Sequence, residues 1–295
     1  HSFPTRRSSD LSGNFLENLF TATSALCVTG LVVNDISITY TIFGKIVILI
    51  LIQLGGLGVL TVSSMVILSI SRKMGYYTKK IVSEDINYNI LTEIPRYLKN
   101  VSIVVFGIEF VGAVLLFFEF SKKMPFIQAV GYSIFHSVSA FCNAGFALFS
   151  NNMENYTGNI LINFVITSLI ILGGLGFAAI LDVYNVIKKT RRKLSTSTHL
   201  AIVMTIFLIC FGAVMTFMLE YSNKGTIGSL NLHDKLLSSY FQSVTLRTAG
   251  FQTVDLATLT TPTIIIYLFL MFIGASPGST GGGLKTTTLG ILLLG

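Results

Sequence analysis

Charged residues are scarce in this 295-residue chain, and their scarcity excludes an ordinary soluble fold. Asp, Glu, Lys and Arg make up 11% of the sequence, against roughly 25% in an average soluble domain. Hydrophobic residues reach 52%, and the mean hydropathy is +0.75. The sequence therefore predicts an all-α polytopic membrane protein, because helices satisfy their own backbone hydrogen bonds inside a bilayer.

Residues for metal binding and covalent chemistry are also few. The three cysteines, Cys27, Cys142 and Cys210, have neither metal-type spacing nor a disulfide framework. The four histidines are scattered, and we interpret none of them as a ligand. No nucleophile and base recur together near one membrane depth, so an enzyme is not expected.

Basic residues are concentrated in two short links between apolar spans. Residues 72–99 and 188–193 hold 11 of the 20 Lys and Arg. This placement is typical of cytoplasmic loops in a multi-pass protein of the cell membrane. It favours lipid as the surroundings and excludes a nucleic-acid surface as the explanation of the net charge of +7.

One short motif occurs three times along the chain. It reads FHSVSAFCNAGF at residues 135–146, LFTATSALCVTGL at 19–31 and FQSVTLRTAGF at 241–251, the third being one residue shorter in its helical part. An apolar stretch too short to span, followed by a glycine turn, predicts a re-entrant pore helix with its loop. Three surface loops with ordinary glycine turns are the alternative.

The apolar spans between these motifs repeat as well. Residues 46–71, 100–118, 160–181 and 200–219 are predicted to cross the membrane. The sequence LGGLG occurs at 54–58 and again at 172–176, where close helix packing is the expected role of the glycines. Residues 256–284 predict a broken helix, because GASPGSTGGG at 274–283 combines one proline with five glycines.

These patterns divide the chain into repeats of helix, re-entrant pore loop and helix around a central cation pathway. Residues 1–12 form a leader resembling a tag, linker or assembly scar. Residues 13–71 form repeat one without its leading helix, 72–188 form repeat two, and 189–295 form repeat three. The ends of the chain lead us to expect a fragment.

The glycine turns suit the chemistry of a dehydrated cation. Such an ion needs oxygen ligands, which backbone carbonyls can supply in a pore. Glycine allows the unusual dihedrals that turn successive carbonyls inward, and Gly30, Gly145 and Gly250 lie where a filter needs them. Pore helices ahead of the loops would point their negative C-terminal ends at the cation.

In these motifs, and in MFIGASPGSTGGGLKTTT at 271–288, residues 13–295 resemble the Trk/Ktr/HKT superfamily of potassium transporters, most closely its bacterial KtrB-type membrane subunits. The resemblance implies four repeats around one potassium pathway, each with one filter segment. The residues implied to bind K⁺ through backbone carbonyls are Val28, Thr29, Gly30, Asn143, Ala144, Gly145, Thr248, Ala249 and Gly250. Those implied to form an intramembrane gate loop are Ser276, Pro277, Gly278, Ser279, Thr280, Gly281, Gly282, Gly283 and Lys285.

The resemblance also implies potassium uptake, passive or coupled to sodium. Glycine at every filter position accompanies potassium preference in this family, whereas serine in the first repeat accompanies sodium permeation. A sodium or mixed-cation transporter, or a non-conducting fragment or assembly unit, are the alternatives. Repeat four is absent, so three filter segments are not expected to conduct unaided.

Homodimers and a cytoplasmic nucleotide-binding regulatory subunit are further implications of the resemblance. The two basic links offer that subunit a docking surface, although topology alone also accounts for them.

Three charged residues keep open interpretations. Glu109 lies within a span, away from the repeated loops, and is either functional or a protonated or paired bundle residue. Arg247 either holds its filter through hydrogen bonds or is a rim charge. Lys285 either repels or pairs with charges near the gate or reaches toward the interface. It falls one residue late for a phosphate-binding loop, so no nucleotide is expected there.

Overall fold

A computed structural model describes residues 15–58, 94–189 and 193–294. Across these ranges the regular structure is helical, apart from an isolated bridge between Ile273 and Leu284. The predicted leader, residues 59–71 of the first predicted span and most of the first basic link lie outside the described residues. So do residues 190–192 of the second basic link.

The helices fall into three units, numbered here along the chain. The first unit contains α1 (Phe15–Leu26), α2 (Ile36–Thr39) and α3 (Ile42–Leu57). The second contains α6 (Ile94–Phe120), α7 (Phe126–Phe141), α8 (Ile160–Leu175) and α9 (Phe177–Ile187), with a 3₁₀ turn at Glu154–Tyr156. The third contains α10 (Thr196–Glu220), α11 (Leu232–Thr245), α12 (Thr261–Phe272) and α13 (Thr286–Leu294), with a 3₁₀ turn at Leu256–Thr258.

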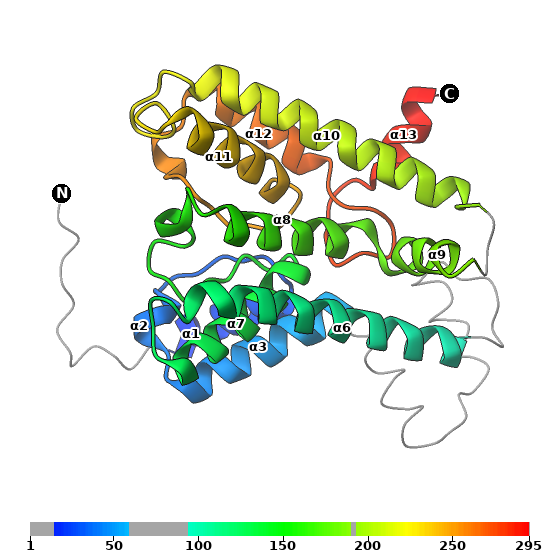
Figure 1. Cartoon of the computed structure of the whole chain (residues 1–295), viewed down its shortest axis with the longest axis horizontal. Coiled ribbons are helices and arrows are strands. Elements are labelled where there is room, and N and C mark those ends of the chain that lie inside the picture. Colours follow the sequence, from blue (N-terminus) through cyan, green and yellow to red (C-terminus); the bar gives the residue numbers. More distant parts are fainter. Residues whose placement is uncertain (1–14, 59–93, 190–192, 295) are drawn as a thin grey trace.

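The units pack through the same kind of contact. Helix α3 of the first unit lies against α7 of the second, and α8 of the second lies against α11 of the third. In Figure 1, α8 runs between the group formed by α1, α3, α6 and α7 and the group formed by α10, α11 and α12. The second helix of one unit thus supports the short helix of the next, which confirms the predicted arrangement of helix, re-entrant loop and helix.

Among the described residues, two single helices have membrane-spanning length. Leu98–Phe120 of α6 and Thr196–Glu220 of α10 are long and apolar enough to cross a bilayer, whereas α3 and α12 are apolar but shorter. The span predicted over residues 160–181 is not a straight helix: α8 and α9 together are long and apolar enough to cross a bilayer, but the chain bends by 102° between them. Gly176 has φ +92°, and the next amide, Phe177 N, donates to Gly278 O at 2.9 Å instead of continuing the helix.

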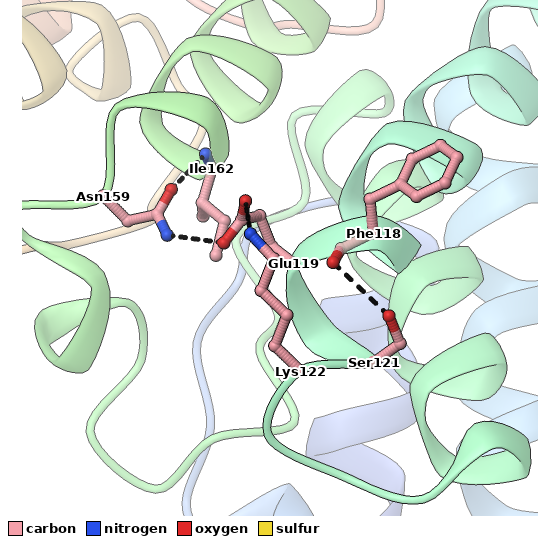
Figure 2. A network of polar contacts seen from close by, with 6 residues as sticks. All are labelled: Phe118, Glu119, Ser121, Lys122, Asn159 and Ile162. Atoms are coloured by element: carbon pink, nitrogen blue, oxygen red, sulfur yellow. Dashed lines mark hydrogen bonds and ion pairs between the residues drawn. The ribbon is translucent and has the colours of Figure 1, made fainter.

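In two of the units an acidic side chain connects the end of one helix to the start of another. At the end of α6, the Glu119 carboxylate accepts from Asn159 Nδ2 at 2.9 Å and pairs with Lys122 Nζ at 2.6 Å (Figure 2). Asn159 also caps α8 by accepting from Ile162 N at 3.0 Å. Next to this tie, the Ser121 hydroxyl donates to Phe118 O, as Figure 2 also shows.

The third unit has a corresponding tie. Glu220 at the end of α10 is fully buried and accepts from the amide of Thr260, the residue that precedes α12, at 2.9 Å. The carboxylate also accepts from Thr226 Oγ1 at 2.7 Å and from the Thr263 hydroxyl. In both units one carboxylate therefore fixes where the second helix begins relative to the end of the first.

Candidate functional site

The three loop segments predicted as filters follow the C-terminal ends of α1, α7 and α11. We number these filter segments along the chain: the first is 28–30, the second 143–145 and the third 248–250. No basic residue lies in the last turn of α1, α7 or α11. Within these last turns no side chain neutralises the partial negative charge of the helix ends, but Arg247 follows α11 by two residues.

The filter segments lie next to one another in chain order. A Cβ atom added to Gly30 would lie 2.5 Å from the carbonyl oxygen of Ala144. One added to Gly145 would overlap the carbonyl oxygen of Ala249, and one added to Gly250 would lie 3.4 Å from Gly145 Cα. Segments separated by more than 100 residues in sequence thus meet backbone to backbone, with the second segment between the other two.

All three filter segments share one unusual backbone pattern. The first and third residue of each segment have positive φ, while the middle residue does not. The first residues are not glycine and adopt this left-handed conformation at a cost, which is common at functional sites. The φ values are 56° and 72° for Val28 and Gly30, 56° and 71° for Asn143 and Gly145, and 63° and 80° for Thr248 and Gly250.

The preceding short helix holds the middle of each segment. Thr29 N donates to Ser24 O at 2.9 Å, and Ala144 N donates to Ser139 O at 2.8 Å. In the third unit Ala249 N donates to Thr245 O at 3.0 Å, which spans one residue fewer. The shorter motif of the third unit is therefore accommodated between the helix and the filter segment.

Ser139 and Thr245 were missed as candidate residues by the sequence reasoning. The Ser139 hydroxyl donates to Phe146 O at 2.8 Å, and the Thr245 hydroxyl donates to Phe251 O at 2.7 Å. The available signal was a hydroxyl residue four positions after the first phenylalanine of each motif. Ser24 holds that position in the first unit, where its hydroxyl pairs with the Thr29 hydroxyl at 2.8 Å.

The segment predicted as a gate loop lies against the second and third filter segments. The Thr280 hydroxyl donates to Phe141 O, at the end of α7, at 3.1 Å. A Cβ atom on Gly281 would lie 2.6 Å from Thr248 Oγ1 and 3.3 Å from the Asn143 amide. The loop is anchored to α8 as well, because Ser276 N donates to Gly174 O at 2.9 Å.

Other residues of this loop have internal contacts. Lys285 Nζ donates to Gly281 O at 3.0 Å and forms no ion pair within the described ranges. The Ser276 and Thr286 hydroxyls share a hydrogen bond of 2.8 Å, and the Ser279 hydroxyl donates to Ser276 O at 2.6 Å. Pro277 O lies 2.5 Å from the position that a Cβ on Gly176 would occupy.

Glu109 lies beside the second filter loop, which corrects the expectation that it lies away from the repeated loops. It is 5% exposed, and its Oε1 is 4.0 Å from the thiol of Cys142, the residue before the second filter segment. Its backbone carbonyl accepts from the Ser137 hydroxyl at 2.6 Å. The side chain therefore lies between α6 and the back of the filter loop.

Arg247 is not a rim charge, because only 4% of the residue is exposed. It precedes the third filter segment, as Cys142 precedes the second. Its Nη2 lies 3.9 Å from the position of a Cβ on Gly174, in the second LGGLG sequence. The corresponding glycine of the first LGGLG sequence is Gly56, where a Cβ would overlap the Cys142 thiol. Neither Nε nor Nη2 of Arg247 has a hydrogen-bond partner among the described residues, so hydrogen bonds from these atoms do not hold the filter there.

Close packing by the LGGLG glycines is confirmed, and it recurs in two units. A Cβ on Gly55 would overlap Leu26 O, and one on Gly173 would overlap Phe141 O, the last residues of α1 and α7. Any side chain at these positions would push the second helix away from the end of the short helix. The glycines therefore determine how closely the spans surround the filter segments.

A cavity of about 420 Å³ lies next to the segment that follows the second filter. Asp35 is near this cavity. Burial raises the pKa of Asp35, but hydrogen bonds from Ser150 and Ser37 and the nearby Lys45 charge outweigh it, so the pKa lies below its usual value. The residues lining the cavity are Ser37, Tyr132, Leu148, Phe149, Ser150, Asn151 and Asn155.

Comparisons with known proteins agree on one family. The sequence model of the TrkH family, described as a cation transport protein, matches residues 2–294. Ktr system potassium uptake protein B of Bacillus subtilis (strain 168) is 39% identical over 95% of the chain. The same-named protein of Vibrio alginolyticus is 37% identical over 94%. Potassium/sodium uptake protein NtpJ of Enterococcus hirae is 34% identical over 96% of the chain.

The fold is that of a solved transporter. The crystal structure of the potassium transporter TrkH from Vibrio parahaemolyticus matches with a TM-score of 0.69 at 20% identity, over 97% of this chain and 56% of that one. The chain spans 62%, 61% and 62% of the three relatives above. The family match over nearly all residues shows that the chain belongs to the TrkH family of cation transport proteins.

Proposed function

We propose that this chain forms the cation pathway of a potassium uptake system of the cell membrane, with the filter segments supplying backbone carbonyls to a dehydrated K⁺. One observation carries the proposal: three segments from different units meet and share the same alternation of left-handed and ordinary dihedrals. Along a short chain this alternation turns successive peptide planes, which allows neighbouring carbonyls to face one side. Carbonyl oxygens arranged in this way can replace a cation's water shell.

The direction of the short helices favours a cation at this place, although the buried Arg247 beside the third filter segment opposes it. The C-terminal ends of α1, α7 and α11 all lead into the filter segments and carry no basic residue in their last turns. Each helix end presents partial negative charge, equivalent to roughly half an elementary charge. Asp35 adds a carboxylate near the cavity next to the segment that follows the second filter, where the charge of Lys45 partly offsets it.

Residues 276–285 are proposed to form the gate. The loop touches the second and third filter segments and is fastened by the Thr280 hydroxyl to Phe141 O. Because α12 ends at Phe272 and α13 begins at Thr286, the loop between them can move without unwinding a helix. Opening would break the contacts at Thr280 and Gly281 while α7 stays in place.

A pathway shared by potassium and sodium is the second candidate. The relative from Enterococcus hirae is named a potassium/sodium uptake protein. The glycines at 30, 145 and 250 favour potassium on the family pattern. A homodimer and a cytoplasmic nucleotide-binding regulatory subunit, docked near the basic links, belong to the same proposal.

Cation uptake into bacteria that lack their own potassium uptake tests the proposal. A transporter containing this chain is expected to restore growth at low K⁺ and to take up Rb⁺ faster than Na⁺. Gly145→Ser is expected to reduce Rb⁺ uptake and the preference over Na⁺, because residue 145 has a left-handed φ and touches the third filter segment.

Gly107→Ala on α6 is the matched control, since a Cβ there meets nothing within 4 Å. Both variants are compared at equal abundance in the membrane. Unchanged ion preference in Gly145→Ser would reject the filter assignment, and equal Rb⁺ and Na⁺ uptake by the unmodified transporter would favour the mixed-cation pathway.

A further inference from the structure

We propose that Ser139 and Thr245 are positioning residues, whose hydroxyls fix the second and third filter segments in the shape that distinguishes K⁺ from Na⁺. The inference rests on the proposed function, because it assigns ion preference to those segments. It concerns residues outside the filter segments themselves. Each residue acts through the backbone carbonyl that follows a filter glycine.

In the second unit, Ser139 holds the filter segment at its middle residue and at the residue that follows it. Its backbone carbonyl accepts from Ala144 N at 2.8 Å, and its hydroxyl donates to Phe146 O at 2.8 Å. Gly145, with φ +71°, lies between these two anchor points. Ser139 is fully buried in the last turn of α7, so water does not compete for either bond.

The third unit repeats this arrangement with a different side chain. The backbone carbonyl of Thr245 accepts from Ala249 N at 3.0 Å, and its hydroxyl donates to Phe251 O at 2.7 Å. The intervening segment is one residue shorter, yet the hydroxyl still reaches the carbonyl directly after the filter glycine. The same bond therefore forms on two different lengths of chain, which points to the fixed carbonyl as the property that matters.

A fixed carbonyl after the filter glycine limits how far the cage of carbonyl oxygens around the ion can contract. The Gly145 carbonyl lies in the peptide plane before the one that carries Phe146 O. Because the Ser139 hydroxyl fixes that second plane, it narrows the range of dihedrals over which the Gly145 carbonyl can turn. A cage that cannot contract fits the larger K⁺ better than Na⁺, whereas a cage free to contract accepts both. Loss of the hydroxyl should thus alter ion preference more than it alters folding.

In the described part of the first unit, Ser24 forms no such bond to the carbonyl after the filter glycine. The Ser24 hydroxyl pairs with the Thr29 hydroxyl at 2.8 Å, so it is attached to a side chain of the first filter segment. Leu31, which follows Gly30, is 61% exposed. The first segment is therefore held less tightly after its glycine. We call the hydroxyl bonds of Ser139 and Thr245 the clamps, and we expect Ser24→Ala to change ion preference less than loss of either clamp.

The test compares hydroxyl removal with hydroxyl exchange in a transporter containing this chain. Ser139→Ala and Thr245→Val remove the donors, whereas Ser139→Thr and Thr245→Ser exchange the two natural side chains. We expect each removal to lower the ratio of Rb⁺ to Na⁺ uptake roughly fivefold, the factor that corresponds to one ordinary hydrogen bond. Each exchange should keep the ratio within about twofold of the unmodified protein.

Two serines provide matched controls. Ser133 and Ser239 are 1% exposed on the same two helices, and their hydroxyls donate to Ala129 O and Lys235 O within those helices at 2.7 Å. Ser133→Ala and Ser239→Ala should leave the uptake ratio unchanged. Equal ratios in the clamp variants and these controls would overturn the inference.

Folding is separated from positioning by a near-isosteric variant. Ser139→Cys keeps the size of the side chain but is a weak donor, so its ratio should fall between those of Ser139→Ala and the unmodified protein. A ratio equal to that of the unmodified protein would count against the clamp. If the unmodified transporter takes up neither ion, the proposed function fails, which is a different result from a clamp without effect.

Discussion

The three filter glycines share a left-handed conformation but differ in what surrounds them. An added Cβ at Gly30 or Gly145 meets a carbonyl oxygen of the next filter segment, whereas one at Gly250 meets only Gly145 Cα at an ordinary 3.4 Å. At all three positions the left-handed φ therefore disfavours any residue with a Cβ. At Gly30 and Gly145 the Cβ would also clash with the backbone of a neighbouring filter segment.

Alanine at each glycine should separate these two effects. Gly250→Ala is expected to lower the free energy of unfolding by about 1–2 kcal/mol, the cost of a left-handed residue with a Cβ. Gly30→Ala and Gly145→Ala should cost a further ~1–3 kcal/mol, because the backbone has to shift around the added atom. Thermal unfolding of the purified protein in detergent gives the order, and a Gly250→Ala variant as unstable as Gly145→Ala would contradict it.

Single residues also show where sequence reasoning stops. The motif pattern locates Gly30, Gly145 and Gly250, because the need for positive φ is a local property that glycine reveals. The surroundings of Glu109 and Arg247 are not local. Glu109 faces a loop that lies about 30 residues away in sequence, and Arg247 is buried by neighbours that include α8, so neither position follows from spacing along the chain.

At the level of helices, the LGGLG sequence determines how the second helix of a unit meets the short helix. Gly173 touches Phe141 O, to which the Thr280 hydroxyl also donates. One contact region therefore joins α8, the end of α7 and the proposed gate loop. Disturbing it should affect all three together.

Gly173→Ala tests this contact against a harmless glycine of the same fold. Its Cβ would overlap Phe141 O, so α8 has to move outward, and we expect destabilisation by about 1–3 kcal/mol. Gly131→Ala on α7 meets nothing within 4 Å and should stabilise by up to ~1 kcal/mol through helix propensity. Thermal unfolding should thus shift in opposite directions, and a shift in the same direction would refute the contact as a constraint on packing.

The helices were predictable to the extent that their causes are local. Proline and glycine at 274–283 predict the break between α12 and α13, and that break is present. The bend after α8 was not predicted, because LGGLG reads equally well as a continuous packed helix. What selects the bend is a hydrogen bond from Phe177 N to Gly278 O, about 100 residues further along the chain.

At the scale of the whole molecule, the repetition of a motif does not predict which filter segments lie next to one another. Three copies of a motif predict three similar loops, but their adjacency depends on α3 packing against α7 and α8 against α11. These contacts place the first filter segment beside the second and the second beside the third. The candidate site therefore forms only when all three units are packed together, so ion binding and unit packing should be coupled.

A bound potassium ion should consequently stabilise the whole protein. An ion at 100 times its dissociation constant adds ~2.7 kcal/mol to the free energy of unfolding, provided that it does not bind the unfolded chain. We expect the Tm of the purified protein to be higher in KCl than in choline chloride of equal ionic strength, with NaCl in between. Gly145→Ser should lose this difference, because residue 145 belongs to the segment that touches both others. Equal Tm values in all three salts would mean that the assembled segments bind no ion, whereas equal stabilisation by K⁺ and Na⁺ would assign the site to both ions.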